Sequence, residues 1–185
     1  MFKNKLINII IGIIIFAIIL YLFSEYNPIS TEFLINQHGL IQAYILEKPT
    51  LSIILFIMII ALLISIMGPI TPMCILAGFY FGVYIGMVIA VLGEVIGAMI
   101  VFIYGRYFFK EYFLKQFGSR FNKLKDGFNR NAINYLLFIR VIGGLPFSIQ
   151  SLLPALFDMK IRDYFIATFF GVMPWAFILV SIGNG

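Results

Sequence analysis

Long apolar runs separated by short polar segments extend along the whole chain. Runs with few or no charges cover residues 6–23, 51–104, 134–157 and 164–183. At ~1.5 Å of rise per residue, about 20 such residues in a helix cross the ~30 Å hydrocarbon core of a bilayer. The pattern predicts an all-α integral membrane protein that folds as a helical bundle.

The composition supports the same class of protein. Of the 185 residues, 62% are hydrophobic and 11% are charged, whereas soluble domains carry roughly 25% charged residues. The mean hydropathy is +1.05. Because the chain has one cysteine and one histidine, little is available for disulfides, metal binding or hydrolysis. We therefore expect no metal, no cofactor and no enzymatic activity.

The N-terminal part is predicted to be a membrane anchor followed by a surface helix. Lysines precede the run 6–23, and no small-x-small cleavage signal follows it, which favours an uncleaved anchor over a signal peptide. Residues 24–49 are more polar, with apolar residues at roughly helical spacing, and indicate an amphipathic helix on the outer interface. The chain thus divides into residues 1–49 and a membrane domain of residues 50–185.

Prolines interrupt the run 51–104. Pro69 and Pro72 lie three residues apart, and each proline removes a backbone hydrogen bond and tends to end a helix. In lipid such a break persists only where protein or a water-filled cavity covers it. The spacing predicts a re-entrant hairpin over 51–83 and a full span over 84–104.

The second half of the membrane domain repeats this plan. Glycines and prolines break the run 134–157, which predicts a second hairpin, and a final span is expected over 164–183. The breaks are at Gly143, Gly144, Pro146 and Pro154. A broken hairpin plus a span, used twice in opposite orientations, is the inverted repeat typical of secondary transporters, whose sites form where the broken helices meet.

The net charge of +5 is a local feature. Seven basic and two acidic residues between Arg106 and Arg130 account for all of it. Positive charge gathered in one short loop is typical of a cytoplasmic connection, so we place the loop 105–131 and the N-terminus in the cytoplasm. This interpretation is preferred to nucleic-acid binding. Successive membrane spans end on alternate sides of the membrane. A cytoplasmic loop 105–131 is therefore possible only if 51–83 is a hairpin that returns to the outside.

Glu94 is the strongest candidate for chemistry. It lies midway along the predicted span 84–104, ~15 Å from either end. A carboxylate in hydrocarbon is costly and has to be paired or protonated. We expect Glu94 to face protein or a cavity and to bind a proton or a lipid headgroup. A neutral carboxyl group that hydrogen-bonds between helices is the alternative.

Arg140 is the second candidate, because it directly precedes the break in the second hairpin. Its planar guanidinium group suits phosphate recognition, although an arginine can also extend to the membrane interface. Arg106, at the inward end of the first span, is more typical of an interfacial anchor. Thr71, Ser148 and Ser151 are polar groups in the hairpins that either contact a ligand or satisfy the broken backbone.

Two segments carry motifs that are similar to those of a known family. The segment GPITPMCILAGFYFGVYIGMVIAVLGEVIGAMIVFIYGR has two prolines, an AG-x2-FG-x3-G stretch and a GR end. The segment RVIGGLPFSIQSLLPALFDMKIRDYFIATFFGVMP has an arginine before a PF pair and a later G-x-x-P. Together they resemble the DedA/VTT superfamily, in its SNARE-associated Golgi protein branch, over roughly residues 50–180. The matching positions are Pro69, Pro72, Gly78, Gly82, Arg106, Arg140, Pro146 and Phe147.

The resemblance implies two re-entrant hairpins that face each other and a role in lipid movement. Eukaryotic relatives are similar to phospholipid scramblases, and some bacterial relatives are linked to recycling of the undecaprenyl phosphate carrier or to proton-dependent membrane homeostasis. This chain departs from the narrower bacterial DedA group in having no acid within residues 50–83.

The expected function is movement of a phospholipid or a lipid-phosphate carrier between leaflets. A proton-coupled transporter of a small solute or ion and a non-transporting membrane scaffold are the alternatives. The expected partners are membrane lipids, with protons and a second copy of the chain as further candidates. A bacterial inner membrane is the expected location, given the residue usage and the uncleaved anchor.

Overall fold

The computed structural model describes residues 31–66, 68–109, 128, 131–143 and 147–185. These residues fall into two compact units, Met1–Lys48 and Pro49–Gly185, and the first is described only by its helix α2 (Thr31–Glu47). The predicted anchor 6–23, most of the predicted loop 105–131, and Gly144 and Pro146 lie outside the described residues.

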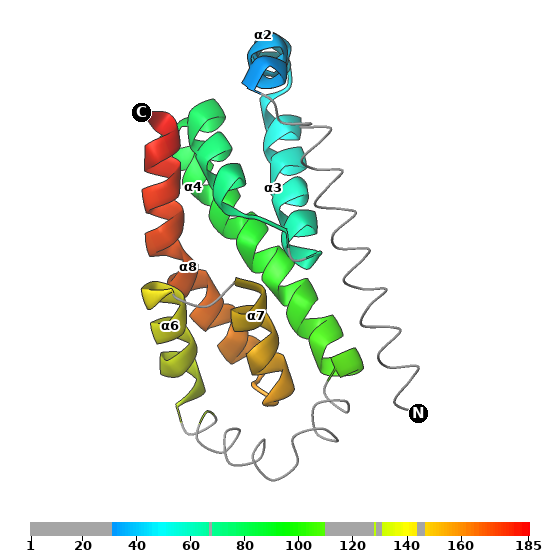
Figure 1. The fold of residues 1–185 in the computed structure, drawn as a ribbon, viewed down its shortest axis with the longest axis vertical. Coiled ribbons are helices and arrows are strands. Elements are labelled where there is room, and N and C mark those ends of the chain that lie inside the picture. The colour runs from blue at the N-terminus through cyan, green and yellow to red at the C-terminus, as the bar shows by residue number, and fades with distance from the viewer. Residues whose placement is uncertain (1–30, 67, 110–127, 129–130, 144–146) are drawn as a thin grey trace. The chain divides into compact units, whose positions relative to one another are not determined.

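Every secondary-structure element in the described part of the second unit is a helix (Figure 1). Its elements are α3 (Pro49–Ser65), α4 (Thr71–Tyr104), a π-helical turn η1 (Gly105–Phe109), α6 (Ala132–Ile142), α7 (Phe147–Leu156) and α8 (Ile161–Asn184). Two described helices, Thr71–Phe108 and Ile161–Asn184, are long and apolar enough to cross a membrane, or up to three spans if Gln37–Glu47 and Pro49–Ser65 count as one broken span. The all-α membrane class predicted from sequence is confirmed.

Helix α4 contains a sharp break at Gly82, whose φ of 73° and ψ of 176° are not helical. A Cβ atom built on Gly86 would lie 2.7 Å from the carbonyl oxygen of Ala77, so the segments on either side of Gly82 pack against each other. The chain therefore reverses there, as the green ribbon of Figure 1 shows. We call residues 71–81 the first arm and residues 83–104 the second arm. The second arm alone, at ~1.5 Å per residue, is ~33 Å long and sufficient to span a bilayer.

Glycines set the spacing between the helices around these arms. A Cβ atom on Gly78 would overlap the backbone carbonyl of Val180, and one on Gly183 would overlap that of Ile75, so the first arm touches the backbone of α8. On the second arm, a Cβ atom on Gly93 would lie 2.6 Å from the Ile60 side chain of α3. Small residues at such crossings allow the close approach on which helix packing in lipid depends.

The second half of this unit has a similar order of elements. Helix α6 ends at a backbone reversal at Gly143 (φ 75°, ψ −146°), and the chain resumes as α7 and then as the long helix α8. Each half thus consists of a helix, a break, a shorter helical segment and a long helix. The two-fold relation between the halves stays a prediction.

The close contact between the first arm and α8 generates a test of stability. We expect Gly78→Ala to lower the melting temperature in detergent, because overpacking a contact of this kind costs ~1–3 kcal/mol. The matched control is Gly39→Ala on α2, where a Cβ atom would meet nothing within 4 Å. That change should leave the melting temperature unchanged or raise it, since alanine favours a helix over glycine. Equal effects of the two substitutions would contradict the packing described here.

Candidate functional site

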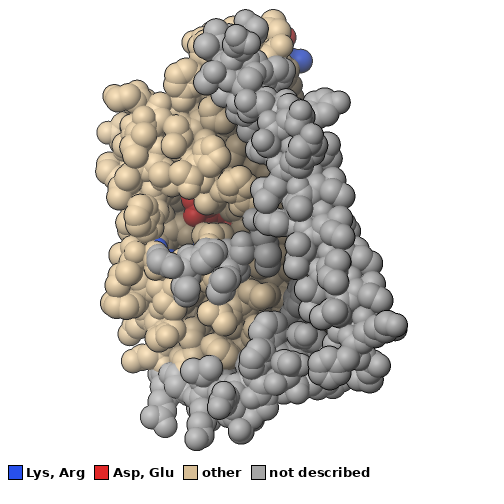
Figure 2. Space-filling view, viewed as in Figure 1, with Lys and Arg blue, Asp and Glu red and all other residues tan. Residues whose placement is uncertain are grey.

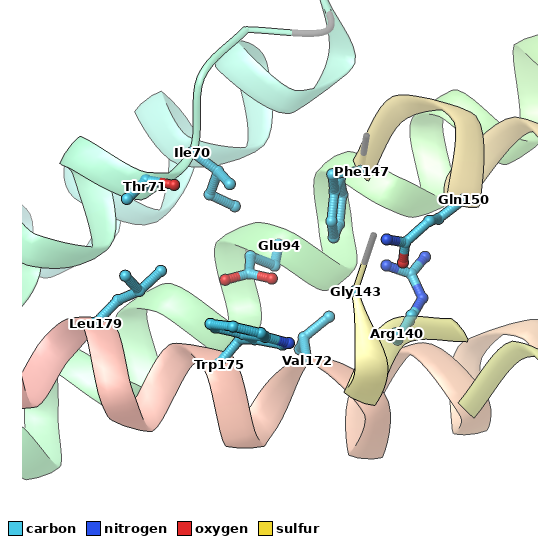
Figure 3. A pocket seen from close by; sticks show the side chains of 10 residues that line it. All are labelled: Ile70, Thr71, Glu94, Arg140, Gly143, Phe147, Gln150, Val172, Trp175 and Leu179. Atoms are coloured by element: carbon cyan, nitrogen blue, oxygen red, sulfur yellow. The ribbon is translucent and has the colours of Figure 1, made fainter. Parts of the chain in front are cut away.

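A cavity of about 260 Å³ lies between two breaks in the helices, the first between α3 and α4 and the second between α6 and α7. Ile70 and Thr71 line it from the first break, and Gly143 and Phe147 line it from the second (Figure 3). The remaining lining residues are Glu94, Arg140, Gln150, Val172, Trp175 and Leu179. Figure 2 shows a hollow in the apolar face, with acidic atoms at its floor. The breaks predicted from glycine and proline spacing therefore enclose a space that holds charged side chains.

Glu94 projects into this cavity from the second arm (Figure 3). Its side chain is 5% exposed, and its Oε1 atom accepts a hydrogen bond of 3.4 Å from the thiol of Cys74. Cys74 belongs to the first arm and is fully buried. The neighbouring Gly93 faces α3, which leaves the adjacent face of the helix, with Glu94, turned toward the cavity. The reversal at Gly82 thus brings a donor from one arm to the acid of the other.

Arg140, in the last turn of α6, is 3% exposed. Its Nη2 atom donates to the hydroxyl oxygen of Tyr164 at 3.1 Å and to that of Ser151 at 3.4 Å. Its guanidinium group also lies over the Phe147 ring, 4.7 Å from the centroid, a favourable cation–π arrangement. Its Nε and Nη1 atoms are buried without a hydrogen-bond partner among the described residues.

The alkyl part of Arg140 passes very close to α8. A Cβ atom built on Gly171 would lie 2.9 Å from the Cβ atom and 3.0 Å from the Cδ atom of Arg140. Interiors pack densely, so a larger residue at position 171 would have to displace the arginine. Gly171 therefore makes room for the charged side chain beside the cavity.

Glu94 and Arg140 line one cavity but do not bond to each other. Every nitrogen atom of the guanidinium group is accounted for among the described residues, either by the bonds to Tyr164 and Ser151 or by the lack of a partner. In the view of Figure 3 the Phe147 ring stands between the two charged groups. The cavity therefore presents an acid and a base at separate positions within apolar walls.

Tyr164 is a residue of the site that the sequence did not single out. It is fully buried on α8, accepts the hydrogen bond from Arg140 and donates its own proton to the carbonyl oxygen of Ala98 at 3.2 Å. Its ring stacks on that of Phe102, with centroids 4.3 Å apart. In a sequence with ten tyrosines, many of them in apolar runs, nothing distinguished this one.

Trp175 is a second residue of the site that the sequence did not single out. Its indole nitrogen donates to the carbonyl oxygen of Val141 at 3.0 Å, at the end of α6. The last carbonyl groups of a helix lack intrahelical partners, so this bond satisfies one of them beside the break. The indole ring also lies against Gly143, where a Cβ atom would be 3.6 Å from it. Trp175 thus supports the break and forms part of the cavity wall.

The other candidates from the sequence are distributed differently. Thr71 lines the cavity, whereas Ser151 is fully buried behind it as an acceptor for Arg140. Arg106 is not among the cavity residues; it donates to the carbonyl oxygen of Met159 at 2.6 Å and lies over the Phe102 ring. Pro154 is buried inside α7 and Pro69 is exposed. The side chain of Ser148 lies outside the described part.

A metal centre is not supported by the described part of the chain. No group of three or more histidine, cysteine, aspartate or glutamate side chains is close enough there to hold an ion. The chemistry available at the cavity is instead ionic and hydrogen-bonding recognition by a carboxyl group, a guanidinium group, an amide and a hydroxyl group.

The contacts of Tyr164 predict a loss of stability when its hydroxyl group is removed. Tyr164→Phe removes the hydroxyl group that accepts from Arg140 and donates to the Ala98 carbonyl group, so Arg140 keeps only the longer bond to Ser151 among those described above. A hydrogen bond to a charged group contributes ~1.5–3 kcal/mol. We expect a lower melting temperature in detergent. The control is Tyr84→Phe, which removes the hydroxyl group of a side chain that is 90% exposed and should change little. Equal melting temperatures for both variants would contradict a supporting role for Tyr164.

Comparison with known proteins places these features in a family. The VTT domain matches residues 68–185, which include both breaks and every residue that lines the cavity. A relative from Dictyostelium discoideum, named Transmembrane protein 41 homolog, is 34% identical over 70 residues. That match covers 38% of this chain and 20% of the relative, so it spans about one fifth of the relative's length. No solved structure matches the chain. Because the domain covers more than half of the sequence, this chain belongs to the DedA/VTT family of integral membrane proteins, whose members are transporter-like.

Proposed function

We propose that this protein moves a phospholipid or a lipid-phosphate carrier between the two leaflets of its membrane. The observation that carries the proposal is the cavity between the two breaks, which holds Glu94 and Arg140 within walls that are otherwise mostly apolar. A charged headgroup crosses hydrocarbon only at a high cost. A polar path inside the protein lowers that cost while the acyl chains stay in lipid.

Arg140 is the proposed contact for the phosphate. A guanidinium group is always charged and forms strong, directional hydrogen bonds to phosphate oxygens. The buried Nε and Nη1 atoms of Arg140 have hydrogen-bonding capacity left, and an unsatisfied buried donor costs ~1–3 kcal/mol. A phosphate oxygen that accepts from either atom would remove that cost.

Glu94 is the proposed balancing charge. It lies in the same cavity and is not bonded to Arg140, so the site has one acid and one base available to a ligand. The carboxyl group would keep the empty cavity close to neutral and would weaken the hold of Arg140 on an anion. A transport site has to release its cargo, and a purely basic cavity would retain it.

The membrane and the orientation belong to the same proposal. We place the protein in a bacterial inner membrane on the basis of its residue usage. We place its N-terminus and the loop 105–131 in the cytoplasm on the basis of the concentrated positive charge. The membrane lipids themselves are then the substrates.

Proton-coupled transport is a second candidate, and the environment of Glu94 favours it. The side chain is 5% exposed, contacts the Cys74 thiol and opens on the cavity, as expected of a group that exchanges a proton. Under this alternative, flux of a small solute or ion would depend on pH, and Glu94→Gln would abolish the dependence.

Leaflet exchange in liposomes tests the leading proposal. Purified protein is reconstituted with a fluorescent phospholipid, and an impermeant quencher is added outside. We expect quenching well beyond the outer-leaflet half in liposomes that contain the protein. Loss of ~1.5–3 kcal/mol of binding to phosphate should slow exchange about 10- to 100-fold in Arg140→Ala. Protection equal to that of empty liposomes, with folded wild-type protein, would overturn general phospholipid exchange and favour a specific carrier lipid, a solute or a scaffold role.

Matched variants separate the site from general charge effects. Arg162 on α8 and Glu47 on α2 are exposed and lie outside the cavity. Arg162→Ala and Glu47→Gln should exchange lipid at the wild-type rate, whereas Arg140→Ala and Glu94→Gln should not. A similar loss in all four variants would show that exchange depends on net charge and not on the cavity.

Trp175 provides a direct measurement of cavity occupancy, because it is the sole tryptophan of the sequence and lines the cavity. In neutral detergent, dihexanoyl phosphatidic acid should change its fluorescence saturably, and dihexanoyl glycerol, which lacks the phosphate, should not. Arg140→Ala should weaken the response about 10-fold or more, from the loss of a charge-assisted hydrogen bond. Equal responses to both lipids would contradict phosphate recognition at this site.

A further inference from the structure

A second hollow, of about 180 Å³, lies between the second arm of α4 and helix α8. We call it the groove. It is lined only by apolar side chains, four from the second arm and two from α8. These are Met87, Val88, Val91, Leu92, Phe169 and Met173. No polar atom contributes to its accessible lining, so the groove has nothing to offer a headgroup, a nucleotide or an ion.

The groove faces the hydrocarbon side of a membrane span. Val88 is 54% exposed and Leu92 is 38% exposed, and both lie within the ~33 Å second arm that is long enough to cross the bilayer. Apolar side chains exposed at that depth meet acyl chains. The groove is therefore open to the tails of membrane lipids.

The groove and the charged cavity adjoin the same buried cluster. On α8, Val172 lines the cavity and Met173 lines the groove, and on the second arm Glu94 lines the cavity while Val91 lines the groove. Val91 and Val172 belong to one buried cluster, against which both Phe147 of the cavity and Met173 of the groove pack. A molecule with a polar end and an apolar end could thus contact both features.

We propose that the groove binds an acyl chain of the lipid whose headgroup enters the cavity. The inference rests on the proposed function and adds to it the place where the tail is held. The lining from Met87 to Leu92 extends over five residue steps, ~7.5 Å at the rise of a helix. This is about half of the ~15 Å thickness of one hydrocarbon leaflet. The groove would hold a segment of the chain rather than its whole length.

The side chains of the groove favour a lipid tail over a second copy of the protein. Helices that associate in lipid do so mainly through small residues, as Gly78 and Gly183 do within this fold. The groove instead has two methionines and a phenylalanine, and the unbranched, adaptable methionine side chain suits a mobile chain of variable shape. An acyl chain is therefore the occupant to which the structure points.

Photo-cross-linking tests the groove without requiring transport. The full-length protein is reconstituted in phosphatidylcholine vesicles that carry a small fraction of phosphatidylcholine with a diazirine group midway along one acyl chain. After illumination, mass spectrometry locates the adducts. We expect at least fivefold more adducts at Met87, Leu92 and Met173 than at Ile100 and Ile103, which are also exposed on the second arm but outside the groove. Even labelling of the five positions, or cross-links between copies at the groove, would overturn the proposal.

Variants that fill the groove provide a second test. Met173→Trp should occupy the hollow and reduce labelling at Met87 and Leu92 severalfold, whereas Ile103→Trp should leave it unchanged. If Met173→Trp fails to fold, Leu92→Phe serves the same purpose, with labelling read at Met87 and Met173. Unchanged labelling in a folded groove variant would overturn the proposal.

The two proposals can fail separately. Labelling confined to the groove in a protein that does not exchange lipid would support the groove and contradict leaflet exchange. Normal exchange with labelling spread evenly over the second arm would support the proposed function and overturn the groove.

Discussion

The backbone has to be covered wherever a helix breaks inside a membrane, and much of this structure follows from that constraint. Hydrocarbon offers no partner for freed amide and carbonyl groups, so broken helices persist only against protein or around water. Here the two breaks face one cavity, which is lined by Thr71 from one and Gly143 from the other. Trp175 supplies a hydrogen bond to a carbonyl group beside the second break. The cavity is thus both a consequence of the breaks and the condition for their stability.

Charge enters this cavity only because the surrounding helices support it. Arg140 is held by Tyr164, which is itself fixed by the Ala98 carbonyl group of the second arm. The guanidinium group of the second half is therefore connected to the helix that carries Glu94 in the first half. Networks of buried hydrogen bonds gain strength in a low dielectric and fail together when one member is lost. The position of the base relative to the acid depends on this shared support.

Much of the fold could be predicted from sequence, because glycine, proline and hydrophobicity act locally. The pattern of apolar runs predicted the all-α class and the long apolar helices. The positions of glycine and proline predicted the breaks near Pro69 and Gly143. Glu94 and Arg140 stood out because charge is rare in apolar runs. Tyr164 and Trp175 did not, since their importance comes from which carbonyl group each one reaches across the fold. Tertiary packing likewise determines that Arg140 donates a hydrogen bond to Ser151 and not to Glu94.

The contact between Gly171 and Arg140 has a consequence for how this site can vary among related sequences. Because the backbone of α8 touches the alkyl part of the arginine, the direction of the charge is set by the path of a helix and not by a free choice of rotamer. Positions 140 and 171 should therefore change in concert: a larger residue at 171 is compatible only with a shorter or absent side chain at 140. Loss of the glycine in a relative would then mark a protein whose cavity lacks this buried charge.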